Sequence, residues 1–312
     1  MVRIKQRGGK DKRGRTVDRD LPRKDTAIAS TPAGAADSAT RLINRELSLL
    51  AFNERVLALA TRTGIPLAER LRYICILSSN LDEFFEVRLS DLIDEMREEG
   101  GWTPASARWG EFEQIADRAH ALVEAQYKHF NDVIMPALGK QGIVVLNHAQ
   151  RTPAQRAWVA EYFEREVRPL LSPIGLDPSH PFPQVMNKAL NFIIQLEGKD
   201  AFGRASTVAI LKVPRVLPRV IPLPARVGGG KHAFVMLTSV IRAHLEDVFP
   251  GRGVAGFSQF RVTRDSDVWV DEREVSNLRQ ALRMELTQRL FGNPIRLEVL
   301  RTCAPPLEHL LR

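Results

Sequence analysis

Apolar residues recur every three or four positions through most of residues 41–142, which indicates a series of amphipathic helices. In the segment ELSLLAFNERVLALA, the predicted inner face consists of Leu49, Phe52, Val56 and Leu59. Gly64 and Pro66 then interrupt the pattern. A second helix is expected to begin near Pro66, because proline suits the first turn of a helix.

The stretch ILSSNLDEFFEVR, residues 76–88, introduces three small polar residues between two apolar segments. Because an apolar stripe resumes at Leu81 and continues to Met96, we expect a third helix with Asn80 as its N-cap. Glu83 would complete a capping box by reaching back to the Asn80 amide. A long helix is then predicted from about Ala107 to Leu138, with an inner face of Phe112, Ile115, Ala119, Leu122, Gln126 and Val133.

The pattern changes after Gly142, where short β-branched and aromatic runs alternate with helical segments. Strands are predicted at residues 143–146, 190–198, 206–214, 219–224, 232–237, 257–265 and 294–300. Helices are predicted at residues 153–168, 239–248 and 271–291, and the proline-rich segment 171–185 is expected to be a loop. The expected fold is therefore multidomain, α and α+β: an antiparallel helical bundle followed by an α+β domain with a mixed or antiparallel sheet.

Charge divides the chain further, because residues 1–24 carry ten Lys or Arg against three Asp, or +7 of the formal net charge of +8. Residues 25–40 are small and polar without periodicity, so residues 1–40 are predicted to be a disordered basic tail. The expected domains are then residues 41–142 and 143–312. The tail is either a solvated extension or a nonspecific attractor of polyanions such as nucleic acid.

Candidate chemistry is sparse in this sequence. It has no motif of the P-loop, serine hydrolase, zinc peptidase or protein kinase type, and its seven histidines do not cluster at ligand spacing, so no metal site is predicted. Cys75 and Cys303 lie far apart, which suits a reducing cytosol. No apolar run approaches the length of about 20 residues that crosses a bilayer, so we expect a cytoplasmic protein without a membrane span.

Several long segments nevertheless resemble the polyphosphate kinases that work through a phosphohistidine. These are ELSLLAFNERVL and PLAERLRYICILSSNLDEFFEVR near the start, then LSPIGLDPSHPFP, KVPRVLPRVIPLP, FRVTRDSDVWVDE and IRLEV. They follow the order of that family and cover about residues 42–312. The family usually has tryptophan where Leu49 stands, a change that retains an apolar contact.

The resemblance implies a helical N-terminal domain, a middle or head domain that contributes to a dimer interface, and reversible transfer of the ATP γ-phosphate to inorganic polyphosphate. It also implies that Asn80 lies near the adenine of ATP, since an asparagine occupies this position of the SNLDEF motif. An amide suits adenine because it can both donate and accept hydrogen bonds. ATP or ADP and polyphosphate are therefore the expected partners, with no specific nucleic acid.

In the family, the nucleophilic histidine, the phosphate-binding residues and the Mg²⁺ site follow the head domain, so no catalytic residue is assigned here. We expect the chain to be the front part of a polyphosphate kinase, inactive by itself, whether through truncation, a fragmentary gene or a split protein. The alternative is a noncatalytic scaffold that binds polyanions or nucleic acid and retains the kinase modules.

Overall fold

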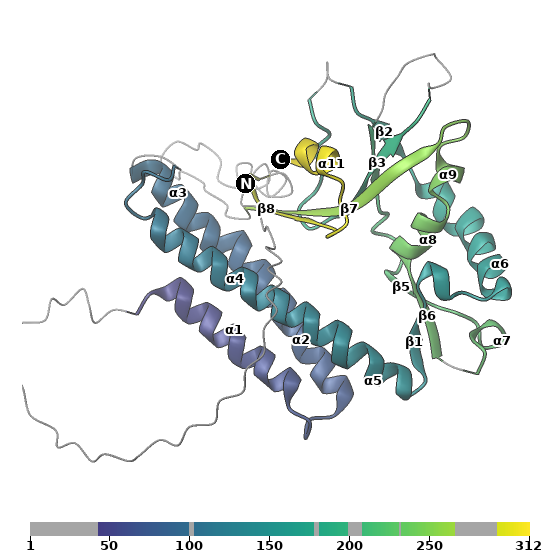
Figure 1. Ribbon diagram of the computed structural model, residues 1–312, viewed down its shortest axis with the longest axis horizontal. Helices are drawn as coiled ribbons and strands as arrows, with labels where there is room; N and C mark the ends of the chain where they lie inside the picture. Colours follow the sequence, from purple (N-terminus) through teal and green to yellow (C-terminus); the bar gives the residue numbers. More distant parts are fainter. Residues whose placement is uncertain (1–42, 100–102, 178–180, 199–207, 231, 266–291) are drawn as a thin grey trace, which may run out of the picture.

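A computed structural model describes residues 43–99, 103–177, 181–198, 208–230, 232–265 and 292–312. Figure 1 shows a bundle of long helices beside a region of strands and shorter helices. This arrangement confirms the predicted combination of α and α+β architecture. The domain boundaries themselves stay a prediction. The basic tail, the helix at 271–291 and the turn between the strands at 190–198 and 206–214 lie outside the described residues.

The bundle consists of α1 (Arg45–Thr61), α2 (Leu67–Glu83), α3 (Leu89–Glu99), α4 (Trp109–His129) and α5 (Met135–Lys140). Single π-helical turns at Phe84–Arg88 and Phe130–Ile134 connect α2 to α3 and α4 to α5. The backbone stays in the right-handed helical region across both joins, so each pair forms one continuous rod. Leu50, Leu77, Leu89, Met96 and Ile115 lie in the shared core.

The predicted N-cap at Asn80 is wrong, because α2 runs through this residue and continues into the π-helical turn. Serine and asparagine are poor helix formers mainly because their side chains compete for nearby backbone groups. Here Ser78 Oγ donates to the Ile74 carbonyl oxygen at 3.2 Å, and the Asn80 side chain bonds to a different helix. Tertiary partners therefore override the local capping signal.

The predicted inner faces of two helices also need correction. In α1, Leu50, Asn53, Val56 and Ala60 are buried, whereas the side chain of Phe52 is 47% exposed. Apolar residues occur on most sides of this helix, so two neighbouring phases fit the pattern equally well. In the long helix, Val133 is exposed and Ile134 is buried, because the π-helical turn adds a residue and shifts the phase.

An antiparallel sheet of five strands, in the order β2-β4-β3-β7-β8, lies against the bundle (Figure 1). Its strands are β2 (Pro173–Gly175), β3 (Leu190–Leu196), β4 (Val208–Lys212), β7 (Val254–Arg264) and β8 (Pro294–Val299). β3 is buried on both faces: Phe192, Ile194 and Leu196 belong to one apolar cluster and Ile193 to another. β2 lies inside the segment predicted to be a loop. The prolines around its three residues make this short strand difficult to predict, because proline is uncommon in strands except at the edge of a sheet.

A smaller sheet has the order β1-β6-β5, with β1 (Ile143–Val145) parallel to β6 (His232–Met236) and β5 (Val220–Pro222) antiparallel to it. The accompanying helices are α6 (Pro153–Tyr162), α7 (Ala225–Gly228), α8 (Leu237–Ala243), α9 (Leu245–Val248) and α11 (Pro305–Leu311). π-helical and 3₁₀ turns at Phe163–Val167 and Arg168–Leu170 follow α6. α6 begins at Pro153, as predicted, with Thr152 as its N-cap, and Gln155 completes a capping box that was not predicted from the sequence.

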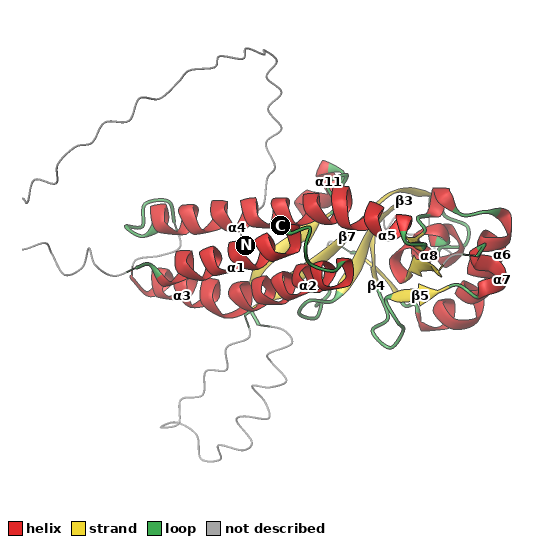
Figure 2. Cartoon of the chain, turned by 90° about the horizontal axis from the view of Figure 1, so that it is seen from below, coloured by secondary structure: helices red, strands yellow, loops and turns green. Residues whose placement is uncertain are grey.

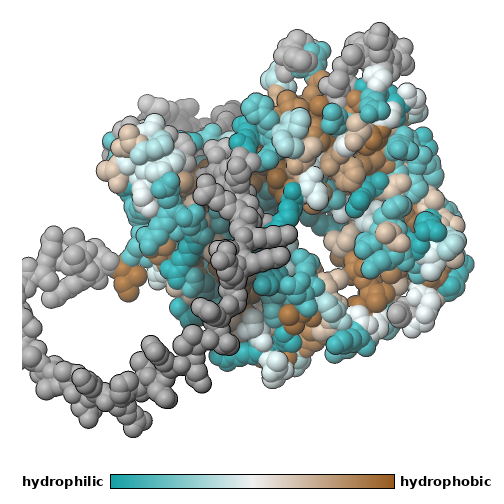
Figure 3. Space-filling model, viewed as in Figure 1, coloured by the Kyte–Doolittle hydropathy of each residue, from teal (hydrophilic) through white to brown (hydrophobic). Residues whose placement is uncertain are grey.

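The two faces of the large sheet have different covers. Phe163, Val240 and Ile241 from the α6 and α8 side belong to one cluster, and Leu307 and Leu311 of α11 belong to the other. Figure 2 shows α6, α7 and α8 at the end of the molecule away from α3. On the face seen in Figure 3, apolar residues gather over the two sheets. Within the described residues, no helix combines the length and apolar character that crossing a membrane would need.

Candidate functional site

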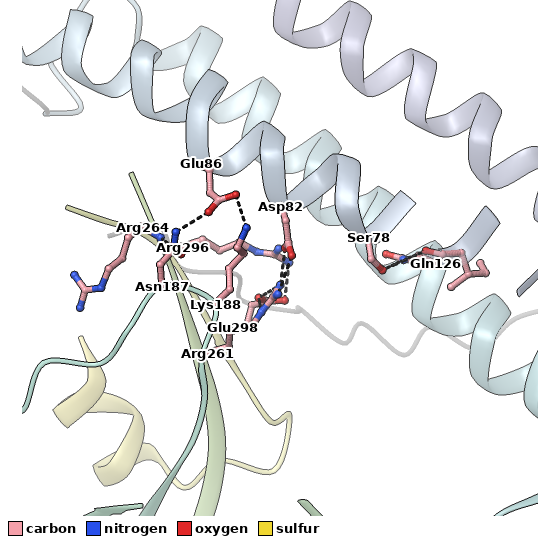
Figure 4. A network of polar contacts seen from close by, with 11 residues as sticks. Ser78, Asp82, Glu86, Gln126, Asn187, Lys188, Arg261, Arg264, Arg296 and Glu298 are labelled. Carbon is pink, nitrogen blue, oxygen red and sulfur yellow. Dashed lines mark hydrogen bonds and ion pairs between the residues drawn. The ribbon is translucent and has the colours of Figure 1, made fainter. Parts of the chain in front are cut away.

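The stretch predicted to carry function, residues 76–88, is where the helical rod of α2 contacts the rest of the molecule. Ser78, Asp82 and Glu86 follow one another at intervals of four residues and therefore share a face of the helix. Ser78 accepts a hydrogen bond from Gln126 Nε2 of α4 at 2.6 Å. Figure 4 shows Asp82 and Glu86 projecting from the same helix toward the strands. One face of α2 thus joins the bundle to the large sheet.

Asp82 forms the centre of this junction with Arg261 of β7. The Arg261 guanidinium donates to both carboxylate oxygens of Asp82, at 2.8 and 3.0 Å, and to Glu298 of β8 at 2.5 Å (Figure 4). Burial acts to lower the pKa of Arg261, but the hydrogen bond that Arg261 donates to Asp82 and the charge of Glu298 more than offset this effect and raise the pKa. Arg261 therefore remains a cation held between two carboxylates.

Glu86 makes the second contact, one helical turn further on. Its carboxylate accepts hydrogen bonds from Asn187 Nδ2 at 2.6 Å and from Lys188 Nζ at 2.7 Å. Lys188 has a φ of 56°, a left-handed conformation that is uncommon for lysine. Asn187 in turn accepts from the Arg264 backbone amide at 2.9 Å. This carboxylate is thus satisfied by a short loop that leads into β3.

Arg296 of β8 lies beneath these ion pairs and is 3% exposed. Its guanidinium stands 4.4 Å from the ring centre of Phe85 and forms an ion pair with Glu298 at 3.0 Å. Burial lowers the pKa of Arg296. Its Nε is buried without a hydrogen-bond partner, as is Nε2 of His120 on α4. On the side of β8, the junction therefore contains a buried guanidinium in addition to the partly exposed Arg261.

We expect His120 to make the fold sensitive to mild acid. Burial and the positive charge of Arg296 lower the pKa of His120, with Asp117 opposing them, so the unfolded chain binds the proton more readily than the folded chain does. Stability should consequently fall as the pH decreases through about 6.5, the ordinary value for histidine. The melting temperature between about pH 7.5 and pH 6 should fall less in His120→Gln than in the native sequence. A residual slope is expected from His148, whose pKa burial also lowers. An unchanged slope in His120→Gln would contradict the assignment.

Asn80, the predicted site residue, points away from this junction toward α1. Its Nδ2 donates to Asn53 Oδ1 at 2.8 Å, and Asn53 Nδ2 donates to the Leu49 carbonyl oxygen at 3.1 Å. Asn53 is buried, whereas Asn80 is half-buried. The two amides form a chain in which each nitrogen donates toward α1. This chain orients the Asn80 side chain with its carbonyl oxygen away from Asn53.

The orientation of Asn80 determines what the site can bind. Among the described residues, none donates a hydrogen bond to Asn80 Oδ1. An amide held by its nitrogen offers this oxygen to a donor such as an exocyclic amino group. In the same part of the structure, no three His, Cys, Asp or Glu side chains lie close enough to hold a metal ion. The arrangement leaves Asn80 Oδ1 available to accept a hydrogen bond.

The pattern of apolar residues did not reveal four side chains that make the contacts described above: Asn53, Asp82, Glu86 and Arg261. A signal for Asn53 exists, because it shares a helical face with Leu50, Val56 and Ala60. A polar residue in that position is expected to have a buried partner. The sequence does not indicate which partner, since Asn80 lies 27 residues away and Arg261 lies 179 residues from Asp82.

Comparison with known families gives two matches that together span nearly all of the described residues. Residues 42–146 match the polyphosphate kinase N-terminal domain, and residues 154–312 match the polyphosphate kinase middle domain. A polyphosphate kinase of Neisseria meningitidis serogroup B is 49% identical over 269 residues, which is 84% of this chain and 39% of the relative. One from Burkholderia multivorans is 46% identical over 273 residues, 87% of this chain and 39% of the relative. The chain thus spans about two-fifths of the length of these curated relatives.

A solved structure agrees with these matches. The crystal structure of polyphosphate kinase from Porphyromonas gingivalis superimposes with a TM-score of 0.64 at 27% sequence identity. The superposition covers 80% of this chain and 38% of that one. The arrangement of bundle and sheets is therefore shared with a protein of known structure.

Proposed function

Since this chain belongs to the polyphosphate kinase family, we propose that it forms the front part of an enzyme that reversibly transfers the γ-phosphate of ATP to inorganic polyphosphate. Within that enzyme, Asn80 binds the adenine ring. The observation that supports this role is the orientation of its side chain, with the nitrogen bonded to Asn53 and the oxygen directed elsewhere. Adenine carries an amino group that can donate to this oxygen, and guanine has a carbonyl at the corresponding position.

We further propose that the residues that transfer phosphate are contributed by segments that the longer relatives possess and that this chain does not match. By itself the chain would then make no polyphosphate from ATP. The head domain, residues 143–312, would contribute to a dimer, as the family resemblance implies. Mg²⁺ is expected to accompany ATP in the complete enzyme. Among the described residues, no three His, Cys, Asp or Glu side chains are close enough together to hold a metal ion, so no metal-dependent step is assigned to them.

Replacing Asn80 with alanine in the complete enzyme is expected to weaken ATP binding by roughly 2- to 10-fold, the value of one hydrogen bond. The preference for ATP over GTP should decrease in parallel, because the oxygen that selects an amino group is lost. The change should also destabilise the fold by about 1–3 kcal/mol, since Asn53 Oδ1 would be buried without its donor. Binding titrations with both nucleotides, below the melting temperature of the variant, measure the effect.

Ser79→Ala is the matched control, because Ser79 is the exposed neighbour of Asn80 on the same helix. It should leave both nucleotide affinities unchanged. If Asn80→Ala retains the native preference for ATP over GTP while losing only stability, Asn80 is a structural residue and the adenine proposal is wrong.

A further inference from the structure

Several basic residues lie at or near the start of α6, and Figure 2 shows this helix at the end of the molecule away from α3. Arg151 immediately precedes the Thr152 N-cap, and Arg156 lies in the first turns of the helix. His148 belongs to a 3₁₀ turn (His148–Gln150) that packs against α8, which carries Ser239 and Arg242. None of these residues belongs to the junction or to the Asn80 site.

Arg151 is unusual because its charge is buried without a counter-ion. The residue is 3% exposed, and its Nη2 donates to Ser239 Oγ at 2.6 Å. Its Nε has no hydrogen-bond partner, and no described carboxylate lies within ion-pairing distance. Burial alone lowers the pKa of Arg151, without an opposing acidic neighbour. A buried guanidinium normally pairs with an anion, because leaving it unpaired costs free energy.

The surrounding cations lie on the surface above Arg151. Arg156 Nη1 donates to the Arg151 carbonyl oxygen at 2.8 Å, which holds its stem over this residue. Arg242 lies three residues after Ser239 on α8, and its guanidinium stands 5.2 Å from the ring centre of Phe257. The pKa of His148 is lowered first by burial and then by the charges of Arg151, Arg242, Arg156 and His244. Asp247 lies nearby but is engaged by His244 Nδ1 at 2.8 Å.

We propose that this basic group binds a phosphate-type oxyanion. Arg151 would supply the buried charge, with a planar fork of donors that matches phosphate oxygens. Ser239 accepts from Arg151, so its own hydroxyl proton remains to be donated to the anion. Arg242 and His148 would close the site from the solvent side, and the positive end of α6 adds to the field. The site is separate from the one that recognises adenine.

Two sources of the anion share this chemistry: orthophosphate and the phosphates of a polyphosphate chain. The second source rests on the proposed function, whereas the site itself does not. Tripolyphosphate serves as the probe for a chain and orthophosphate as the probe for the single ion. Binding of tripolyphosphate at least about tenfold tighter than orthophosphate, or 1.4 kcal/mol, would assign the site to polyphosphate. Equal affinities would assign it to orthophosphate.

The test uses the 312-residue chain at constant ionic strength, with calorimetric titration and thermal melting. We expect Arg151→Met and Arg242→Gln to weaken binding of the probe by roughly 10- to 100-fold, the value of a charge-assisted contact. Without the probe, Arg151→Met should melt at the native temperature or above it, because an unpaired buried charge has been removed. The probe should then raise the melting temperature of the native chain and leave that of Arg151→Met unchanged.

Arg165→Gln is the control, because it removes the same charge from an exposed side chain that pairs with Glu161 and Glu166. It should retain native affinity for the probe. The proposal is overturned if Arg151→Met and Arg242→Gln bind as tightly as the native chain, which would assign binding to the basic residues 1–24. Equal weakening by Arg165→Gln would likewise show attraction without a site. Nucleotide preference at Asn80 is measured independently, so either proposal can fail alone.

Discussion

Phe85→Ala is expected to lower the free energy of unfolding by about 3–5 kcal/mol, the cost of emptying a large aromatic site in a core. Phe85 is 1% exposed and packs edge-on against Phe84 with ring centres 5.6 Å apart. The guanidinium of Arg296 lies 4.4 Å from the centre of the Phe85 ring, so the substitution also removes a cation–π contact. Urea denaturation followed by circular dichroism measures the loss.

Phe52→Ala provides the comparison, because it deletes the same side chain from a position where 47% of it is exposed. The loss there should be smaller, about 1–1.5 kcal/mol, since roughly half of the side chain is already exposed to water. The pair also tests the observed phase of α1. Should Phe52→Ala cost as much as Phe85→Ala, the face predicted from the sequence would be the buried one.

Replacing Arg261 with methionine is expected to destabilise the fold by about 2–4 kcal/mol. Methionine retains the apolar volume of the arginine stem but leaves Asp82 and Glu298 facing each other without their shared cation. Each of these side chains is about one-fifth exposed, so water softens the cost only in part. The loss should shrink in an Asp82→Asn background, where one of the opposed charges is absent. Chemical denaturation of the single and double variants measures this coupling.

Arg118→Met is the control, because it removes an arginine–carboxylate pair of similar geometry from an exposed position. Arg118 also binds a carboxylate through two hydrogen bonds, at 2.7 and 2.8 Å to Glu54, but this pair is on the surface. An exposed ion pair contributes about 0–1 kcal/mol, so its loss should be small. If Arg118→Met and Arg261→Met cost the same, the connection between α2 and the sheet does not derive its strength from burial.

The elements of this fold could largely be predicted from local patterns. The long helix after Ala107, the capped start at Thr152 and the strands around Phe192 and Phe260 all lie where periodicity indicates. Such signals are local, because side-chain spacing and caps depend on residues within a few positions of each other. The helix start predicted at Asn80 shows the limit of such local signals. The sequence around Asn80 fits an N-cap, but in the fold its side chain bonds to Asn53 of another helix and α2 continues through it.

The candidate site could be predicted only in part. The family resemblance singled out Asn80, whereas the partner that orients it became visible only in three dimensions. The same holds for Asp82 with Arg261 and for Arg151 with Ser239, which lie 179 and 88 residues apart. Polar pairs carry no periodicity, so a sequence read alone does not indicate which members meet. Their geometry depends on how elements far apart in the sequence pack against one another.

Ile295 of β8 is 1% exposed and belongs to the apolar cluster of the helical bundle, although it comes from the region predicted as the second domain. The guanidinium of Arg296 packs over Phe85 of the same cluster, so β8 contributes two side chains to the core of the bundle. If residues 41–142 were exchanged between relatives, the transferred helices would therefore lack the β8 side chains that complete their core. Positions on the two sides of this boundary are expected to vary together in evolution, as partners within one inherited unit.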